Sequence, residues 1–223
     1  MTTATRPRLP LSRDRILRAA LALADEGGID ALTMRKLGQV LGFEAMSLYN
    51  HVANKDDVLD GILDLVLDES EPPSPAGDWH TAIRNSAISV HQGLTRHPWA
   101  CPLLMSPGRI RPARLQYIDS LLGRLREAGF SAETTYHAYH VLDAHIFGFS
   151  LWQANHSYSA AQISNLAAEW LERMIPPDVY PHLHEHGEQH LAGGPHHDVS
   201  AFEFGLGFIL DGLEKIRDAE QAP

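Results

Sequence analysis

TMRKLGQVLGFEAMSLYNHVANKDDVLD, residues 33–60, carries the start and stop signals of three consecutive helices. Thr33 is a suitable N-cap, because its hydroxyl can accept a hydrogen bond from the first helical turn. Gly42 stands where a left-handed residue ends a helix. Between them, apolar residues recur at spacings of three and four, at Leu37, Val40 and Leu41. The pattern predicts a helix up to residue 41 and a tight glycine turn after it.

Two further helices are predicted beyond the turn. Glu44 would open the first, where a carboxylate suits the positive helix end, and Leu48 and Val52 would face inward. Asn54 is the expected N-cap of the next helix, which carries an apolar stripe. That stripe consists of Val58, Leu59, Ile62, Leu63, Val66 and Leu67. Two helices joined by a glycine turn predict a helix-turn-helix, which reads the major groove of DNA; a three-helix bundle with no DNA role is the alternative.

The same residues carry a family resemblance. ADEGGIDALTMRKLG at 24–38 and LGFEAMSLYNHVANKDDVL at 41–59 resemble the N-terminal domain of tetracycline-repressor-type regulators. The resemblance implies an all-α fold in two parts. A three-helix helix-turn-helix DNA-binding domain would occupy 1–60, with a connecting helix to about 70. A larger helical ligand-binding and dimerisation domain would occupy 76–218.

The net charge of −10 is unevenly distributed. Residues 1–60 hold eight Lys or Arg and eight Asp or Glu, so the whole of the −10 falls on residues 61–223. A chain this acidic should not coat DNA indiscriminately and would need its N-terminal end against phosphate. Arg6 and Arg8 would contribute there, or would form a solvated tail.

Composition also bounds the location of the protein. A single cysteine, Cys101, excludes a disulfide within one chain. The first residues lack the apolar core of a secretory signal, and no apolar run approaches the length that crosses a bilayer. We therefore expect no membrane association and a cytoplasmic location.

The segment EPPSPAG at 71–77 reads as a linker between the N-terminal helices and the body. Beyond it, caps, breaks and apolar spacing predict helices near 79–97, 111–128, 131–156, 160–174 and 199–217, with a short helix or turn ending at 105. Leu115 is expected on the inner face of the second of these. Residues 176–192 form a mixed, histidine-rich stretch.

Residues 140–152 and 199–213 are apolar on too many faces for surface helices of a monomer. Both contain glycines that permit close helix approach. Two such helices from each subunit would make a four-helix homodimer interface; the alternative is that both are core helices of one chain. The resemblance favours a homodimer through 131–156 and 199–217, which would match a palindromic double-stranded operator.

Position in the motif predicts the residues that contact DNA. They are Thr33, Arg35, Ala45, Met46, Ser47, Tyr49, Asn50, His51 and Lys55. Arg35 is the best candidate for guanine, since its fork matches the acceptor pair of that base. The tetracycline repressor has Gln and Pro in place of Ala45 and Met46, and Trp in place of Asn50. We therefore expect a different operator.

The resemblance also implies a ligand pocket in the body. The positions that map to it are Ser86, Val90, Tyr136, Tyr139, His140, Asp143, Phe147 and Trp152. Aromatic rings with one His and one Asp suit a small, partly aromatic or apolar effector; for His140 the alternative is a satisfied core histidine. The residues at the repressor's tetracycline contacts differ, so neither tetracycline nor a metal is predicted, and no cofactor.

A histidine cluster at 182, 184, 186, 190, 196 and 197 allows two other readings, a metal site or a pH sensor. His186 and His190 would share a helix face. HGEQH, however, is not the zinc-protease pattern, and no thiolate is near. A solvated segment is the expectation we prefer, and we predict no metal.

Together these features predict a transcriptional regulator, most simply a homodimeric repressor that a small molecule releases from its operator. The alternatives are an activator, a regulator that requires a corepressor, or a helical enzyme with a degenerate DNA-binding head. The sequence contains no Gly-x-Ser-x-Gly, phosphate loop or dinucleotide fingerprint, so we expect no enzymatic activity.

Overall fold

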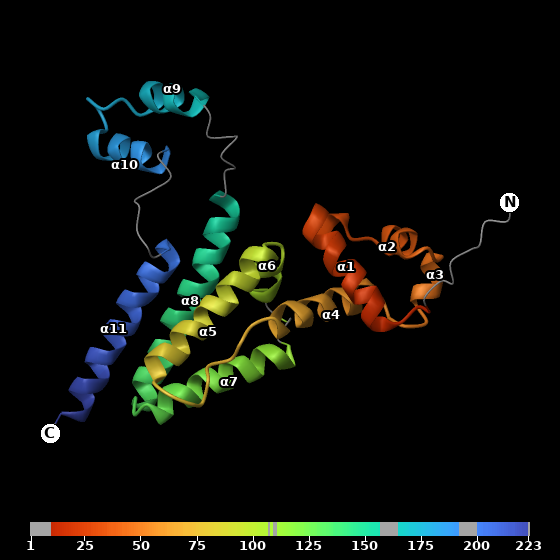
Figure 1. The fold of residues 1–223 in the computed structure, drawn as a ribbon, viewed down its shortest axis with the longest axis horizontal. Coiled ribbons are helices and arrows are strands. Elements are labelled where there is room, and N and C mark those ends of the chain that lie inside the picture. Colours follow the sequence, from red (N-terminus) through yellow and green to blue (C-terminus); the bar gives the residue numbers. More distant parts are fainter. Residues whose placement is uncertain (1–9, 107, 109–110, 157–164, 192–199, 223) are drawn as a thin grey trace.

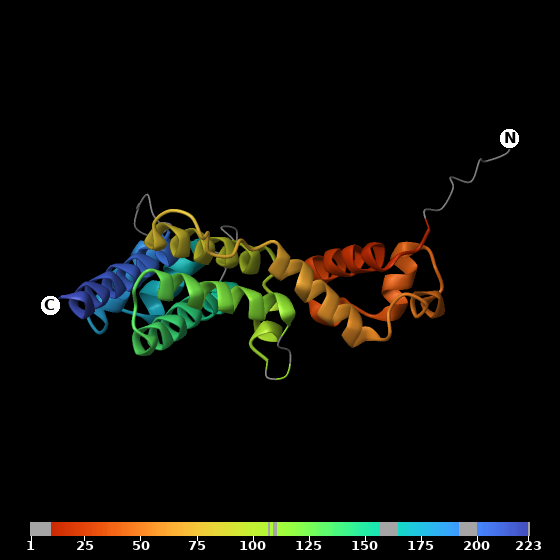
Figure 2. The same ribbon diagram turned by 90° about the horizontal axis from the view of Figure 1, so that it is seen from below.

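The computed structural model describes residues 10–106, 108, 111–156, 165–191 and 200–222, and these residues fold into helices without a strand (Figure 1). This confirms the all-α prediction. The molecule is elongated, with a small N-terminal head at one end and a larger body at the other (Figures 1 and 2). The head contains α1 (Arg13–Gly27), the 3₁₀ turn η1 (Ile29–Ala31), α2 (Met34–Leu41), α3 (Ala45–Leu48) and the start of α4 (Lys55–Asp68).

The predicted caps Thr33, Gly42 and Asn54 are present, and Ser12 caps α1 in the same way as Thr33 and Asn54. Ser12, Thr33 and Asn54 each accept a hydrogen bond from the backbone N–H three residues later. Gly42 ends α2 with φ 75°, in the left-handed region. Val40 shares the helical spacing of Leu37 and Leu41, yet its side chain is 58% exposed. The buried face of α2 consists of Leu37, Gly38 and Leu41, so Val40 lies at its edge.

Helix α4 belongs to both parts of the molecule. Its first half packs on α1, where Gly61 lies against Leu17. Its second half contributes Leu63 and Val66 to a cluster with Ala100 of the body. The sequence predicted a domain boundary near residue 60, but α4 has buried residues both before and after it.

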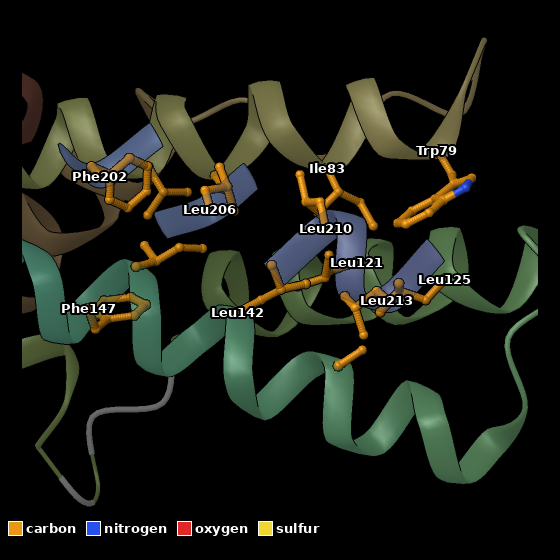
Figure 3. Packing of buried hydrophobic residues seen from close by; sticks show 14 of the residues in the cluster. Trp79, Ile83, Leu121, Leu125, Leu142, Phe147, Phe202, Leu206, Leu210 and Leu213 are labelled. Carbon is orange, nitrogen blue, oxygen red and sulfur yellow. The ribbon is translucent and has the colours of Figure 1, made fainter. Parts of the chain in front are cut away.

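The body is built around one apolar cluster. Its main helices are α5 (Trp79–Arg96), α7 (Pro112–Glu127), α8 (Ala132–His156) and α11 (Ala201–Gln221), and α6 (Ala100–Leu104) packs against α8. All four main helices contribute large side chains (Figure 3), namely Trp79, Ile83, Leu121, Leu125, Leu142, Phe147, Phe202, Leu206, Leu210 and Leu213. Burying this surface stabilises the body by roughly 25 cal/mol per Å² of apolar area.

Two predictions for the body need correction. Leu115 is 54% exposed, because α7 turns Leu121 and Leu125 to the core. The histidine-rich stretch is not mixed but contains a helix, α10 (Pro181–Leu191), paired with α9 (Asn165–Met174) (Figure 1). The predicted start of the preceding helix, residues 160–164, lies outside the described residues. No described helix is both long enough and apolar enough to cross a membrane.

Candidate functional site

The turn between α2 and α3 depends on two glycines. The first is Gly42, the left-handed residue that ends α2. The second is Gly38, where an added Cβ atom would stand 2.8 Å from the carbonyl oxygen of Phe43 and 3.2 Å from the nitrogen of Ala45. The N–H of Phe43 donates to the carbonyl of Gly38 at 2.9 Å. Only a residue without a side chain lets the two helices approach this closely.

The turn presents α3 at the end of the molecule farthest from the C-terminus (Figure 1). Leu48 and Val52 are buried and anchor the helix to the head, as predicted. The opposite side carries the residues predicted to contact DNA. Met46 is 75% exposed and Tyr49 43% exposed. Asn50, His51, Thr33, Arg35 and Lys55 are also exposed, and Ala45 and Ser47 are half-buried.

Charge distinguishes this end from the body. Within the described part of the chain, Arg35, Lys36 and Lys55 form no ion pair, and all three are exposed. Arginines of the body are neutralised instead, as in Arg84–Glu203 at 2.6 Å and Arg96–Glu69 at 2.7 Å. Unpaired cations beside an exposed helix can bind phosphate without first breaking an internal ion pair.

The arginines that begin the first helix have internal partners. Arg13 pairs with Asp57 of α4 at 2.9 Å, and Arg15 donates to the carbonyl of Leu41 at 3.5 Å. Both bonds tie α1 to its neighbours in the head. Arg6 and Arg8, predicted to contact phosphate or form a tail, lie outside the described residues.

A hollow of about 490 Å³ lies in the body, within the size range of small-molecule pockets. The end of α4, the linker, α5 and α7 form its wall. The lining residues are Leu67, Asp68, Ser70, Pro72, Val90, Ala113, Arg114, Gln116, Tyr117 and Ser120. Val90 is the one predicted ligand residue that lines it directly.

Several other predicted ligand residues contact residues of this lining without lining the hollow themselves. Asp143 pairs with Arg114, whose guanidinium lies 4.3 Å from the centre of the Phe147 ring. Ser86 bonds to Tyr117 and donates to the Glu71 carbonyl at 2.7 Å. Burial raises the pKa of Tyr117, so its hydroxyl stays protonated.

Tyr139 belongs to the same group. Burial, and then the neighbouring Asp143, raise the pKa of its hydroxyl, and Arg114 bonds to it. Arg114, Gln116 and Tyr117 were missed by the sequence reasoning. Ala113, Gln116 and Ser120, at spacings of three and four, form a small and polar strip along α7, and this strip was the available signal.

The structure does not bring Tyr136, His140 and Trp152 to the hollow. Tyr136 is 60% exposed and Trp152 51% exposed. His140 is exposed as well, and its Nδ1 bonds to the Tyr136 carbonyl at 2.8 Å, so it is not a core histidine either. Their contact with a ligand stays a prediction.

Among the α10 histidines, His184 is the one whose described contacts tie it to α9. His184 is buried, with Nδ1 2.6 Å from the Ile175 carbonyl and Nε2 3.7 Å from Glu172. It lines a second hollow, of about 510 Å³, between α9 and α10. Among the described residues no group of three His, Cys, Asp or Glu is placed to hold a metal ion. His196 and His197 lie outside the described residues.

Comparisons with known proteins agree with this arrangement. Residues 16–62 match the family of bacterial regulatory proteins called tetR, and residues 71–217 match the tetracyclin repressor-like C-terminal domain. The HTH-type transcriptional repressor DrrR1 of Streptomyces coeruleorubidus is 31% identical over 97% of this chain and 83% of its own. The class D tetracycline repressor of Escherichia coli is 31% identical over 90% and 93%.

Solved structures share the fold. Apo ActR from Streptomyces coelicolor is 26% identical, with a TM-score of 0.71 over 95% of this chain and 99% of that one. ActR has also been solved in complex with actinorhodin, at 27% identity and a TM-score of 0.70 over 94% and 99%. With both parts matched in order along the chain, the protein belongs to the tetR family of DNA-binding transcriptional regulators.

Proposed function

We propose that the protein is a homodimeric repressor that binds a palindromic operator through α3 and is released by a small molecule bound in the body. The observation that carries the proposal is the exposed α3, flanked by the exposed cations Arg35 and Lys55, which form no ion pair with any other described residue. Its place of action would be the cytoplasm, where bacterial DNA lies.

The exposed face of α8 and α11 supports the dimer. Helix α11 buries Phe202, Leu206, Leu210 and Leu213, yet on another side Phe204 is 59% and Phe208 67% exposed. Helix α8, which packs beside it, exposes Val141 and Trp152. Exposed apolar area of this kind marks an interaction surface.

The glycines of these helices support the same arrangement. A Cβ on Gly205 would meet His145 at 2.7 Å, so this glycine permits the packing of α11 on α8 within one chain. A Cβ on Gly148, Gly207 or Gly212 would meet nothing within 4 Å. Those three leave room for the close approach of helices from a second subunit.

The hollow beside Arg114 supports a small-molecule effector. Its lining joins apolar groups to a few hydroxyl, amide and charged groups, which suits a partly aromatic or apolar compound with polar substituents. ActR, which shares the fold, was solved with actinorhodin bound. We propose no metal in recognition, because the described residues of the lining include a single carboxylate and no His or Cys.

Selection of duplexes from a random DNA pool tests the proposal. We expect recovery of an inverted repeat, protected in footprints of the gene's own upstream region. Candidate aromatic compounds are then added to the complex, and DNA release is measured by fluorescence anisotropy. Recovery of no preferred sequence would contradict sequence-specific DNA binding. Tighter DNA binding in the presence of the compound would contradict release by an effector.

A further inference from the structure

A polar cluster joins the head directly to the body, apart from the continuous helix α4. In the last turn of α1, Asp25 Oδ1 accepts hydrogen bonds from His97 Nδ1 at 2.7 Å and Trp99 Nε1 at 2.8 Å. His97 ends α5 and Trp99 precedes α6, so both belong to the body.

The end of α4 completes this cluster. Glu69, the C-cap of α4, lies 3.3 Å from His97 Nε2 through Oε1. Its other oxygen accepts from Arg96 at 2.7 Å. The His97 side chain is only 8% exposed. We call Asp25, Glu69, Arg96, His97 and Trp99 the Asp25 cluster.

The cluster gives the head a second attachment. A head held by one helix can turn about the axis of that helix and bend with it. A second attachment on α1, made by bonds to a carboxylate, restrains both motions. Bonds of this kind are the stronger class of hydrogen bond, and burial of His97 shields them from water.

We propose that the Asp25 cluster positions the DNA-binding head, and thereby sets the distance between the two heads of the dimer. The proposal rests on the dimeric operator binding proposed above. A two-fold dimer reads half-sites whose centres are separated by a fixed number of base pairs. Heads held at the matching distance bind without first being ordered, which favours the correctly spaced operator.

The test compares two adjacent substitutions in the same helix. Asp25→Ala removes the acceptor of both bonds. Glu26→Ala removes the same charge one residue later, from an exposed side chain outside the cluster. The probes are the duplex recovered by selection, the same duplex with one base pair inserted or deleted between half-sites, and a duplex with one half-site. Circular dichroism shows that each variant is folded.

We expect Asp25→Ala to weaken binding of the correctly spaced duplex by about tenfold, the loss expected for one or two such bonds. Its affinity for the respaced duplexes should fall less, so the spacing preference shrinks. Half-site affinity should stay within about twofold, because one head on one half-site needs no fixed partner. Glu26→Ala should match the unaltered protein on every probe.

An Asp25→Ala variant that keeps the full spacing preference would overturn the proposal. Should that variant not fold, Trp99→Phe, which removes one bond and keeps an aromatic ring, takes its place under the same criterion. Failure of the proposed function is a separate result, because the unaltered protein would then show no spacing preference at all.

Discussion

Gly38 shows how one residue fixes the geometry of the DNA-binding turn. The space beside its Cα is occupied by backbone atoms of Phe43 and Ala45, which cannot rotate away as a side chain can. A larger residue must push α3 off α2 and shift the exposed face of α3 with it. A side chain at position 38 would therefore displace Met46 and Tyr49.

Gly38→Ala should destabilise the protein by about 1–3 kcal/mol, the usual cost of overpacking a tight site. The matched control is Gly123→Ala in α7, where a Cβ would meet nothing within 4 Å. That substitution should stabilise by about 0.5–1 kcal/mol through helix propensity. Urea denaturation measures both. A neutral Gly38→Ala would show that the turn can relax.

Arg35 and Lys55 should separate sequence reading from phosphate binding. Arg35→Ala should cost about 1–3 kcal/mol on the selected site and far less on random DNA, if its fork contacts guanine. Lys55→Ala should weaken both by a similar factor and reduce the salt dependence of binding. Affinities at several fixed salt concentrations measure this, and equal behaviour of the two variants would refute the assignment.

At the scale of one helix, α11 has two apolar faces with different partners. The face of Phe202 and Leu206 completes the core of the body. The other face carries Phe204 and Phe208, whose rings meet edge to face at 4.9 Å. A helix that is apolar on both sides needs neighbours on both, which is why we assign the second face to a partner subunit.

Phe208→Glu should dissociate the dimer, because a charge would be buried at the interface without a partner. Sedimentation at about 5 μM should show monomers, with operator affinity reduced at least tenfold through loss of the second half-site. Leu115→Glu is the control, since it places the same charge at another exposed apolar side chain, on α7. A dimeric Phe208→Glu would place the interface elsewhere.

The packing of α5 against α8 and α11 should be sensitive to acid. His91 of α5 stacks on Phe202 with ring centres 3.9 Å apart. Its Nδ1 lies 2.8 Å from Ser150 Oγ, which donates to Ile146 and so accepts from the ring. Burial, and then the neighbouring His145, lower the pKa of His91, while Glu203, itself paired with Arg84, acts in the opposite direction.

Acidification should therefore destabilise the body. Because the pKa of His91 is lower in the folded chain, the unfolded chain binds more protons below about pH 6.5, and stability falls as pH falls. His91→Gln, which cannot be charged, should give a shallower dependence between about pH 7.5 and 5.5. Denaturation at each pH measures both slopes, and identical slopes would contradict this role.

Sequence predicted elements better than it predicted contacts between them. Thr33, Asn54 and Gly42 are local signals, and each marks a helix end where expected. Leu115 was misplaced because three-four spacing does not say where a neighbouring helix stops covering a face. The helix α10 was missed because histidines and Gly187 give weak helix propensity, which pairing with α9 overrides.

The candidate sites follow the same division. The exposed face of α3 was predictable, because a local motif fixes which residues of a short helix point outward. The lining of the hollow was not, since Arg114 and Tyr117 face it only once α7 packs beside α4 and α5. Tyr136 and Trp152 map to pocket positions by alignment, yet they lie on the exposed side of α8.

At the scale of the whole molecule, the head and the body lie at opposite ends (Figure 2) and differ in charge. The first 60 residues sum to zero charge and the remainder to −10. The acidic body should be repelled by DNA, so that the exposed cations around α3 orient the approach. Helix α4 and the Asp25 cluster then connect the DNA-binding head to the hollow and to the exposed faces of α8 and α11, through which two subunits would pair.

The mass of the saturated complex with the selected duplex tests the central claim most directly. Sedimentation velocity or native mass spectrometry should show one duplex carrying two chains, on a site that reads as an inverted repeat. A complex of one chain per duplex on an asymmetric site would contradict the account.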